Sequence, residues 1–343
     1  MNVLYTTYQT AFQNPGGGET QLRKTCSHVN KKTPDVDLFD PFESTIEEYD
    51  VLHAFSSHYD NLETVRYATN TGVPTAISTI YWEPLEYFRV QVGITSYIKM
   101  VEDVRKRLTC KLRVTYLDKH KQLYDCADLL LPNSQTEANL IANKFNISKE
   151  KFHVVPNAED ERFADATPEA FENTFGYDDF ILFVGYLSPR KNLITMLEAL
   201  HDINQDIVVI GTGPDHYVNQ CKQAADDNVH FLGRVDHNDP LLESAYAGCD
   251  TFVLPSWYET PGLAALEAAL AGAKIVVTDR GSTEEYFEDF VWYVDPSDPE
   301  SIRKAVMDAV AAEQKDVLSN RIRNNYLWSD TARESVAAYE KLL

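Results

Sequence analysis

Two glutamates and two cations lie in predicted loops where their side chains suit a phosphorylated ligand. Glu259 and Glu267 are eight positions apart, and an Ala/Leu-rich helix is predicted to begin near Gly262. Eight residues of helix span about 12 Å, which is comparable to the distance from a sugar to a ribose across a diphosphate. We therefore expect Glu259 to hold a transferred sugar and Glu267 a ribose, with the helix N-terminus directed at the phosphates. The alternative for Glu267 is a helix-face carboxylate that pairs with a nearby cation.

The two cations, Arg190 and Lys191, follow a strand that ends near Gly185 and precede a predicted helix. Two positive charges at a helix start are unfavourable to the helix dipole, so we expect an anion to compensate them. Arginine offers a bidentate fork for a phosphate, and lysine offers a point charge. The pair is therefore predicted to bind phosphate, and the alternative is a solvated surface pair.

Glycine-rich loops follow two other predicted strands. Gly16, Gly17 and Gly18 open a helix after the first strand, where close backbone approach and exposed N–H groups favour an anion. Their spacing is neither that of a P-loop nor that of a dinucleotide fingerprint, and a flexible turn is the alternative. Gly211 and Gly213 end another strand, and that loop also lacks the third glycine of the fingerprint.

The elements that must position these loops alternate between strands and helices along most of the chain. Such alternation predicts βαβ units and parallel sheets, whose ligands bind beyond the carboxyl ends of the strands. Six strands in each half favour two doubly wound α/β domains, although periodicity alone does not distinguish them from one barrel. The predicted strands are Val3–Thr7, Val36–Phe39, Val51–Phe55, Thr75–Ile80, Leu129–Leu131, Phe152–Val155, Phe180–Val184, Ile207–Ile210, His230–Leu232, Thr251–Leu254, Lys274–Val277 and Trp292–Val294.

The chain length of 343 residues suits two domains of ordinary size. An acidic stretch, Asn157–Thr167, marks the boundary, which gives an N-terminal acceptor-side domain over 1–160 and a C-terminal domain over 161–327. The remaining segment, 328–343, predicts a helix that packs back on the first domain through one apolar face. That face consists of Ala332, Val336, Tyr339 and Leu343.

Charge and cysteine content narrow the class of protein. The net charge of −22 argues against nucleic acid as the main partner, because phosphate-backbone binding needs a basic surface. No apolar run reaches the roughly 18 to 20 residues of a spanning helix, and the N-terminus lacks the basic start of a signal peptide. Five cysteines are scattered without a C-x-x-C pair, which favours reduced thiols in a cytoplasmic protein over disulfides or a zinc site.

One segment reverses the sign of the charge. Between Arg89 and Lys121 nine Lys/Arg residues oppose three acidic ones, and the cations are mixed with apolar side chains. Segments of this kind lie on anionic membrane surfaces. We predict that 89–121 docks peripherally at the inner membrane face, and the alternative is a solvated, salt-bridged pair of helices.

Taken in order along the chain, these loops resemble those of the family 4 retaining glycosyltransferases. That family has the GT-B fold of two facing Rossmann-like domains, and the resemblance covers nearly the whole chain. The matching elements are a GGxE-type loop at Gly17–Glu19, the pair Pro156-Asn157, a G-x-L-x-x-x-K element at Gly185–Lys191, Leu232-Gly-Arg-Val235, and an E-x7-E motif at Glu259–Glu267.

The resemblance also implies residue roles. Lys191 and Arg190 would neutralise the diphosphate leaving group and Glu259 would contact the donor sugar, so these three are the predicted catalytic residues. Tyr186 stands where the family often has arginine, which places more of the neutralisation on the Arg190–Lys191 pair. The predicted donor-binding residues are Gly17, Gly18, Gly185, Arg190, Lys191, Gly211, Arg234, Val235, Glu259, Thr260, Gly262, Leu263, Ala264 and Glu267.

The acceptor side carries weaker signals. Many family members have a histidine in the loop that here contains Trp82 and Glu83, and this chain has none there. We expect Trp82 and Glu83 to line an acceptor pocket, with ordinary packing as the alternative for Trp82. His53 lies in the predicted strand Val51–Phe55 and His58 just after it, and both are candidates to face the cleft between the domains, with structural roles as the alternative.

The resemblance implies a retaining hexosyltransferase that moves a sugar from a UDP- or GDP-sugar to a glycan or lipid-linked acceptor in polysaccharide or glycoconjugate biosynthesis. The donor phosphate would accept the acceptor's proton, so no enzymic base, cofactor or metal is expected. Asp35 and Asp37 form one D-x-D, a chance match whose alternative is metal-dependent chemistry of the GT-A type. Other functions left open are a sugar-nucleotide epimerase, a phosphorylase, and a catalytically silent subunit that binds a nucleotide sugar.

Overall fold

The computed structural model describes residues 1–13, 16–31, 35–82, 116–313 and 316–343. They divide into two compact units, the first made of 1–82, 116–158 and Trp328–Leu343 and the second of Glu159–Leu327. From the sequence, the boundaries between the two domains are predicted after residues 160 and 327. Glu83 and residues 89–115 of the predicted membrane segment lie outside the described residues.

The first unit is built on a parallel sheet to which the described residues contribute five strands. The spatial order β2-β1-β3-β4-β5 changes direction between β1 and β3, and open parallel sheets bind ligands at such a switch point. The strands are β1 (Asn2–Thr7), β2 (Asp35–Leu38), β3 (Val51–Phe55), β4 (Thr75–Ser78) and β5 (Leu129–Leu131).

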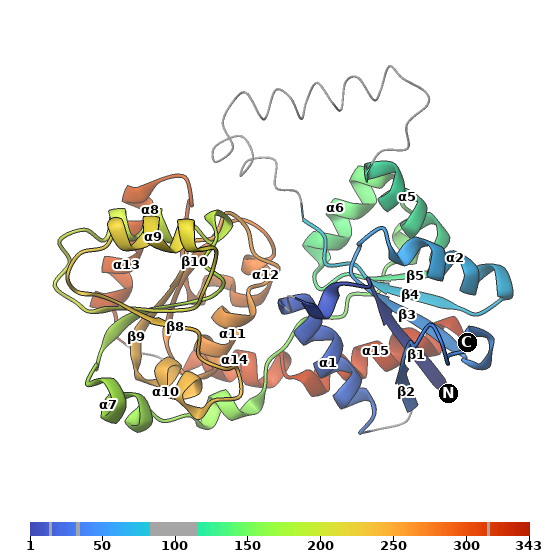
Figure 1. Ribbon diagram of the computed structural model, residues 1–343, viewed down its shortest axis with the longest axis horizontal. Coiled ribbons are helices and arrows are strands. Elements are labelled where there is room, and N and C mark those ends of the chain that lie inside the picture. Colours follow the sequence, from blue (N-terminus) through green and yellow to red (C-terminus); the bar gives the residue numbers. More distant parts are fainter. Residues whose placement is uncertain (14–15, 32–34, 83–115, 314–315) are drawn as a thin grey trace, which may run out of the picture. The chain divides into compact units, whose positions relative to one another are not determined.

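Helices cover both faces of this sheet, because successive strand residues point to opposite sides (Figure 1). Leu4 belongs to the core under α2 (Asn61–Thr71), α5 (Tyr116–Cys126) and α6 (Gln135–Phe145). Tyr5 belongs to the core under α1 (Gly17–Val29) and α15 (Trp328–Leu342). The predicted C-terminal helix is therefore present, with Tyr339 fully buried and its hydroxyl 2.7 Å from that of Tyr5. Leu343 was wrongly assigned to its buried face, because it lies beyond the helix end and is 67% exposed.

The predicted strand Phe152–Val155 is also wrong, since this segment forms only an isolated bridge between Phe152 and Leu130. The N–H groups of His153 and Val155 donate to the carbonyls of Leu130 and Pro132, each at 2.9 Å. The next bond of a parallel ladder would have to come from the N–H of residue 132, and proline has none. The described part of the first unit therefore has five strands where six were predicted.

The second unit contains a parallel sheet of order β11-β10-β9-β6-β7-β8. Numbered within the unit, this is the 3-2-1-4-5-6 order of the classic dinucleotide-binding fold, with its switch point between β6 and β9. The strands are β6 (Phe180–Val184), β7 (Ile207–Ile210), β8 (Val229–Gly233), β9 (Cys249–Leu254), β10 (Lys274–Thr278) and β11 (Trp292–Val294). The prediction of two doubly wound parallel-sheet domains is confirmed.

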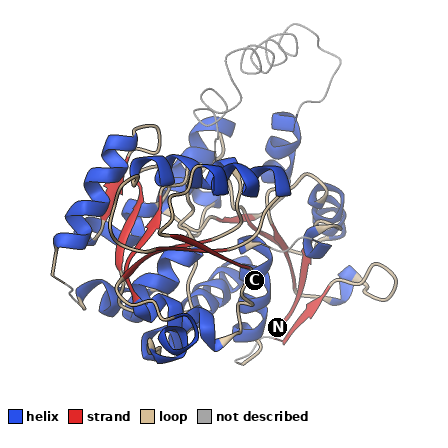
Figure 2. Cartoon of the chain, turned by 60° about the vertical axis from the view of Figure 1, so that its left-hand side comes forward, coloured by secondary structure: helices blue, strands red, loops and turns tan. Residues whose placement is uncertain are grey.

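Helices again lie on both faces of the second sheet, as Figure 2 shows by secondary structure. One face carries α8 (Leu193–Ala199), α9 (Asp215–Gln223) and α13 (Pro299–Ala311). The other carries α7 (Glu169–Phe175), α10 (Pro240–Gly248), α11 (Leu263–Leu270) and α14 (Val317–Asn325), while the short α12 (Thr283–Phe287) follows β10. In the portions of the chain that the structure describes, no helix has both the length and the hydropathy to cross a bilayer.

Candidate active site

The predicted phosphate and sugar loops follow the two adjacent central strands of the second sheet. β6 and β9 are paired, so the loops after them, Gly185–Lys191 and Pro255–Gly262, meet at the switch point. The two loops are bonded directly, since the N–H of Trp257 donates to the carbonyl of Arg190 at 2.9 Å. Asn192 adds a side-chain bond to the carbonyl of Pro255 at 3.1 Å.

This arrangement brings the three predicted catalytic side chains together. Lys191 Nζ lies 2.5 Å from Glu259 Oε1, and one guanidinium nitrogen of Arg190 lies 3.4 Å from the same oxygen. Arg190 also donates to the carbonyl of Tyr258 at 2.9 Å, which holds its guanidinium at the loop. The side chain of Glu259 is only 6% exposed, whereas that of Arg190 is 32% exposed. The cluster thus has a buried carboxylate and a cation that reaches solvent.

The cluster shifts the pKa of two of its members. Burial by itself would raise the pKa of Glu259, but the charges of Lys191 and Arg190 outweigh it and hold that pKa below its usual value. Burial lowers the pKa of Lys191, and the charge of Arg190 lowers it further, while Glu259 opposes both. Glu259 is therefore ionised at neutral pH and is the anion that compensates the two cations.

Close contacts between the loops after the strands require glycine at three positions, Gly211, Gly213 and Gly281. A Cβ on Gly211 would lie 1.9 Å from the carbonyl oxygen of Gly185, so the loops after β6 and β7 pack backbone against backbone. A Cβ on Gly281 would lie 1.9 Å from the carbonyl oxygen of Glu259. The N–H of Ser282 donates to that same oxygen at 3.0 Å, so the loop after β10 sets the backbone position of Glu259. Gly281 was not predicted from the sequence. Its only signal there is a glycine shortly after a predicted strand.

The start of α11 lies next to the Glu259 carboxylate. Gly262 has φ = +97°, a conformation that L side chains rarely adopt, and precedes the first helical residue. A Cβ there would lie 3.4 Å from Glu259 Oε2. Thr260, Leu263 and Ala264 are partly exposed around this helix start. Backbone N–H groups, a helix dipole and two cations are thus gathered within one loop pair, an arrangement that suits phosphate.

Glu267, the second glutamate of the motif, lies in α11 and is 5% exposed. The hydroxyl of Tyr246 donates to its Oε2 at 2.5 Å, and His237 Nε2 lies 2.7 Å from its Oε1. Burial, followed by the charge of Glu267, raises the pKa of Tyr246 well above its usual value, so this phenol remains a donor. Arg162 donates to the carbonyl of His237 at 2.6 Å and helps to place it. None of these partners was found from the sequence.

Glu267 also belongs to a group of three side chains that could hold a metal ion. The ligand atoms of Glu159, His237 and Glu267 lie within 4.8 Å of one another, and Glu159 and Glu267 are buried. Carboxylate and imidazole donors suit several divalent ions. The absence of a metal from the reaction therefore stays a prediction.

The other predicted donor-binding residues lie in separate loops. Arg234 and Val235 follow β8, with Arg234 exposed. Gly17 and Gly18 form the first turn of α1 in the first unit, where the Glu19 carboxylate accepts from the N–H of Gly16 at 2.7 Å. Tyr186 is 50% exposed and brings no charge to the loop after β6. Their contacts to a donor stay predictions.

The structure separates the two candidate histidines of the acceptor side. His53 has no exposed surface, and its ring nitrogens lie 2.7 Å from the hydroxyl of Tyr339 and 3.0 Å from that of Ser78. It is a core residue of the first unit, which agrees with the structural alternative and removes it as a candidate to face a cleft. His58 is 35% exposed in the loop after β3, and Trp82 is partly exposed after β4, so both stay candidates.

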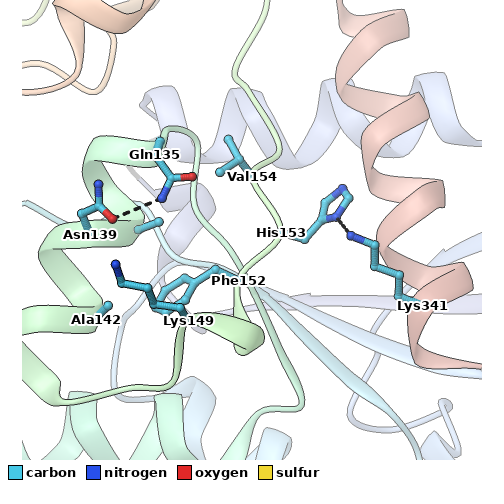
Figure 3. A pocket seen from close by; sticks show the side chains of 9 residues that line it. Gln135, Asn139, Ala142, Lys149, Phe152, His153, Val154 and Lys341 are labelled. Atoms are coloured by element: carbon cyan, nitrogen blue, oxygen red, sulfur yellow. Dashed lines mark hydrogen bonds between the residues drawn. The ribbon is translucent and has the colours of Figure 1, made fainter.

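A separate pocket of about 310 Å³ lies in the first unit beside α6 (Figure 3). Gln135 and Asn139 from α6, Phe152 and His153, and Lys341 from α15 are among the residues that line it. Lys341 Nζ lies 2.5 Å from His153 Nδ1, and burial lowers the pKa of His153. This pocket shares no residue with the predicted site.

Comparison with known proteins identifies a family of glycosyltransferases. Residues 148–326, just over half of the chain, match the model of a family described as glycosyl transferases group 1. An uncharacterized glycosyltransferase of Methanocaldococcus jannaschii is 32% identical over 189 residues, which is 50% of this chain and 47% of that protein. The O-antigen chain mannosyltransferase B of Escherichia coli is 24% identical over 253 residues, which is 68% of this chain and 66% of that protein.

The matched region thus spans less than two thirds of the length of either curated relative. A solved structure covers the whole fold, namely Anabaena Alr3699/HepE in complex with UDP and glucose. It superimposes with a TM-score of 0.72 at 16% identity, and the match covers 100% of both chains. The two units therefore have the fold of that protein. This result agrees with the GT-B fold that the resemblance implies.

Proposed function

The chain belongs to the group 1 glycosyltransferases, whose model matches more than half of it, and on that premise we propose that it transfers a sugar from a nucleotide diphosphate donor to a hydroxyl acceptor. The donor is a UDP- or GDP-hexose, the acceptor is a glycan or a lipid-linked glycan, and the anomeric configuration is retained. The name of the O-antigen chain mannosyltransferase supports a place in glycan synthesis. The UDP and glucose named with HepE support a nucleotide and a hexose as ligands.

The observation that carries the proposal is the cluster of Lys191, Arg190 and Glu259 at the switch point of the second sheet. When a glycosyl–phosphate bond breaks, negative charge develops on the departing diphosphate. Preorganised cations and a helix N-terminus stabilise such charge in a site that is largely shielded from water. Lys191 and Arg190 supply the cations, and the turn at Gly262 supplies the N–H groups of α11.

The two glutamates then have distinct tasks. Glu259, held at the end of β9 by the loops after β6 and β10, orients the hydroxyls of the donor sugar. Glu267 accepts from the ribose hydroxyls, and Tyr246 and His237 hold its carboxylate in place. Orientation of this kind converts binding energy into rate. With the donor phosphate as the proton acceptor, the reaction needs no enzymic base and no metal.

A thermal-shift series with UDP, GDP and their common sugar conjugates, each with and without magnesium, tests the proposal. We expect one nucleotide class to raise the melting temperature whether or not magnesium is present. A shift that requires magnesium would contradict the metal-free reaction. If no nucleotide or conjugate produced a shift, the proposed donor class would be wrong.

Peripheral attachment at a membrane is a separate proposal, since it depends on 89–121, of which the structure describes only Tyr116–Lys121. Within those last residues Lys121 forms an ion pair with Asp125 at 2.9 Å. Flotation with neutral and with anionic liposomes tests the idea, and equal recovery with both would contradict it.

A further inference from the structure

A strained residue lies in the first unit just after β4. Ile80 has φ = +46°, the left-handed conformation that is unusual for any side chain and most unfavourable for a β-branched one. Such strain persists only where the surrounding structure over-determines it, and it concentrates at functional positions. The residues that hold Ile80 and the residues that it contacts therefore indicate what the strain is for.

One buried carboxylate holds both neighbours of Ile80. Glu137, in the first turn of α6, has no exposed surface. Its Oε1 accepts from the hydroxyl of Thr79 at 2.5 Å and from the N–H of Tyr81 at 2.6 Å. Its Oε2 accepts from the N–H of Asn133 at 2.9 Å. A carboxylate makes stronger bonds to such donors than a neutral group does, so these bonds can sustain an unfavourable backbone conformation.

Helix capping alone does not account for this geometry. In a capping box the glutamate at the third helical position returns to the N–H of the N-cap residue, which here is Ser134. Glu137 instead reaches one residue further back and across to the loop after a neighbouring strand. Ser57, from the loop after β3, also donates its N–H to the carbonyl of Thr79 at 2.9 Å. Two neighbouring loops thus hold the turn at Ile80 in place.

The strained turn directs Ile80 onto the glycine loop at the start of α1. The Cδ1 atom of Ile80 lies 3.4 Å from the position that a Cβ on Gly18 would occupy. β1 and β4 are not neighbours, since β3 lies between them. The side chain of Ile80 therefore lies beside Gly18 across an intervening strand, and Trp82, a candidate acceptor residue, follows Ile80 by two positions.

From this geometry we propose that Glu137 and Ile80 are positioning residues for the transfer reaction. Glu137 maintains the left-handed turn, the turn seats Ile80 on Gly18, and this contact keeps the glycine loop and the Trp82 segment in one relative position. The inference rests on the proposed function and adds residues to it. Neither residue needs to touch the substrates, because a displacement of about 1 Å at a reacting centre can cost about 10²-fold in rate.

The decisive variant is Ile80→Gly, because glycine adopts the left-handed conformation without strain. Relief of the strain is opposed by the loss of a partly buried side chain and by the greater backbone entropy of glycine in the unfolded chain, so the variant's melting temperature should stay near that of the parent chain. Asn146→Gly is the matched control, since Asn146 has φ = +53° in the same unit and ends α6 away from both loops. Glu137→Gln is a second variant that keeps the shape of the side chain and loses the charge and one acceptor.

Hydrogen–deuterium exchange of the backbone amides is the first readout. In Ile80→Gly and Glu137→Gln, we expect faster exchange at residues 79–82 and also at residues 16–20, with Asn146→Gly unchanged at both. Faster exchange at 79–82 alone would show that the turn does not control the glycine loop and would overturn the proposal. If Glu137→Gln does not fold, Ile80→Gly still decides the question.

The second readout is turnover, measured as nucleoside diphosphate released from UDP-glucose and from GDP-mannose, together with the binding of UDP and GDP alone. We expect Ile80→Gly to bind the nucleotide like the parent chain and to turn over about 10²-fold more slowly. Parent-like turnover in a variant whose exchange has changed would also overturn the proposal. If the parent chain binds neither nucleotide, the proposed function fails, and the exchange experiment still tests the coupling of the loops.

Discussion

The two units use buried carboxylates in different ways at the carboxyl ends of their strands. In the first unit Glu19 and Glu137 accept from backbone N–H groups and from hydroxyls. In the second unit Glu259 is bound by two cations. A carboxylate that accepts from neutral donors defines the shape of a loop, whereas cations that are paired with a carboxylate can bind another anion in its place.

This difference separates the residues that shape the site from those that act on charge. Replacing Glu137 should change where loops lie without changing the electrostatics of the diphosphate position. Replacing Lys191 or Glu259 should do the reverse. Substitutions in the two units therefore have different signatures, and each prediction below tests one side of the contrast.

The largest effect is expected for Lys191→Ala. Loss of one preorganised donor at a developing negative charge costs about 10²- to 10³-fold in kcat, and nucleotide affinity should fall much less if Lys191 acts mainly in the transition state. Steady-state turnover and UDP or GDP affinity measure the two effects. Lys304→Ala, at an exposed position of α13, is the control. Equal losses in turnover and affinity would mean that Lys191 binds the donor equally well in the ground state and in the transition state.

A smaller effect with a distinct pH signature is expected for Glu259→Gln. The carboxylate opposes the lowering of the Lys191 pKa by burial and by Arg190, so its removal should lower that pKa further. Because Lys191 acts as a cation, the alkaline limb of the pH–rate profile should move to lower pH, with kcat at neutral pH reduced at least about tenfold, or about 1.4 kcal/mol. Glu198→Gln, exposed on α8, is the control. An unmoved alkaline limb would mean that Glu259 does not set the charge of Lys191.

Tyr246→Phe should have a more modest effect, on nucleotide affinity. It removes the phenol that orients Glu267, and a hydrogen bond to the ribose that is weakened by about 1 kcal/mol corresponds to about a fivefold rise in Kd. Calorimetric titration with UDP or GDP measures the change. Tyr217→Phe, a buried tyrosine on α9, is the control. A parent-like Kd would mean that Glu267 does not bind the ribose.

The fold and the charged loops could be predicted because their signals are local. Strand and helix periodicity predicted all eleven strands of the described residues. The loops of Arg190, Lys191 and Glu259 follow strands whose adjacency the doubly wound order requires. The one wrong strand, Phe152–Val155, depends on the missing N–H of Pro132, which is visible only once the neighbouring strand is known.

The partners of the buried glutamates could not be predicted, because they depend on tertiary contacts. His237 and Tyr246 meet Glu267 across 30 and 21 residues of chain, and Glu137 meets Tyr81 across 56. The same limit explains His53, whose partner Tyr339 is 286 residues away. A histidine inside a strand gives no indication of which residue will cover it.

The smallest effect on activity, and the sharpest test of the structural side of the contrast, is expected for His53→Gln. Burial lowers the pKa of His53 to about 3, whereas an unfolded histidine titrates near 6.5. Between those values the unfolded chain binds the additional proton, so His53 should reduce stability as the pH falls from about 6.5 towards 3, by up to about 1.4 kcal/mol per pH unit.

His53→Gln should melt below the parent at pH 7, because its hydrogen bonds to Tyr339 and Ser78 are altered, yet lose less of its melting temperature between pH 7 and pH 5. Turnover per folded molecule should equal that of the parent. A variant that stayed as acid-sensitive as the parent would contradict a neutral, buried His53, and a loss of turnover without a loss of stability would return this residue to the acceptor side.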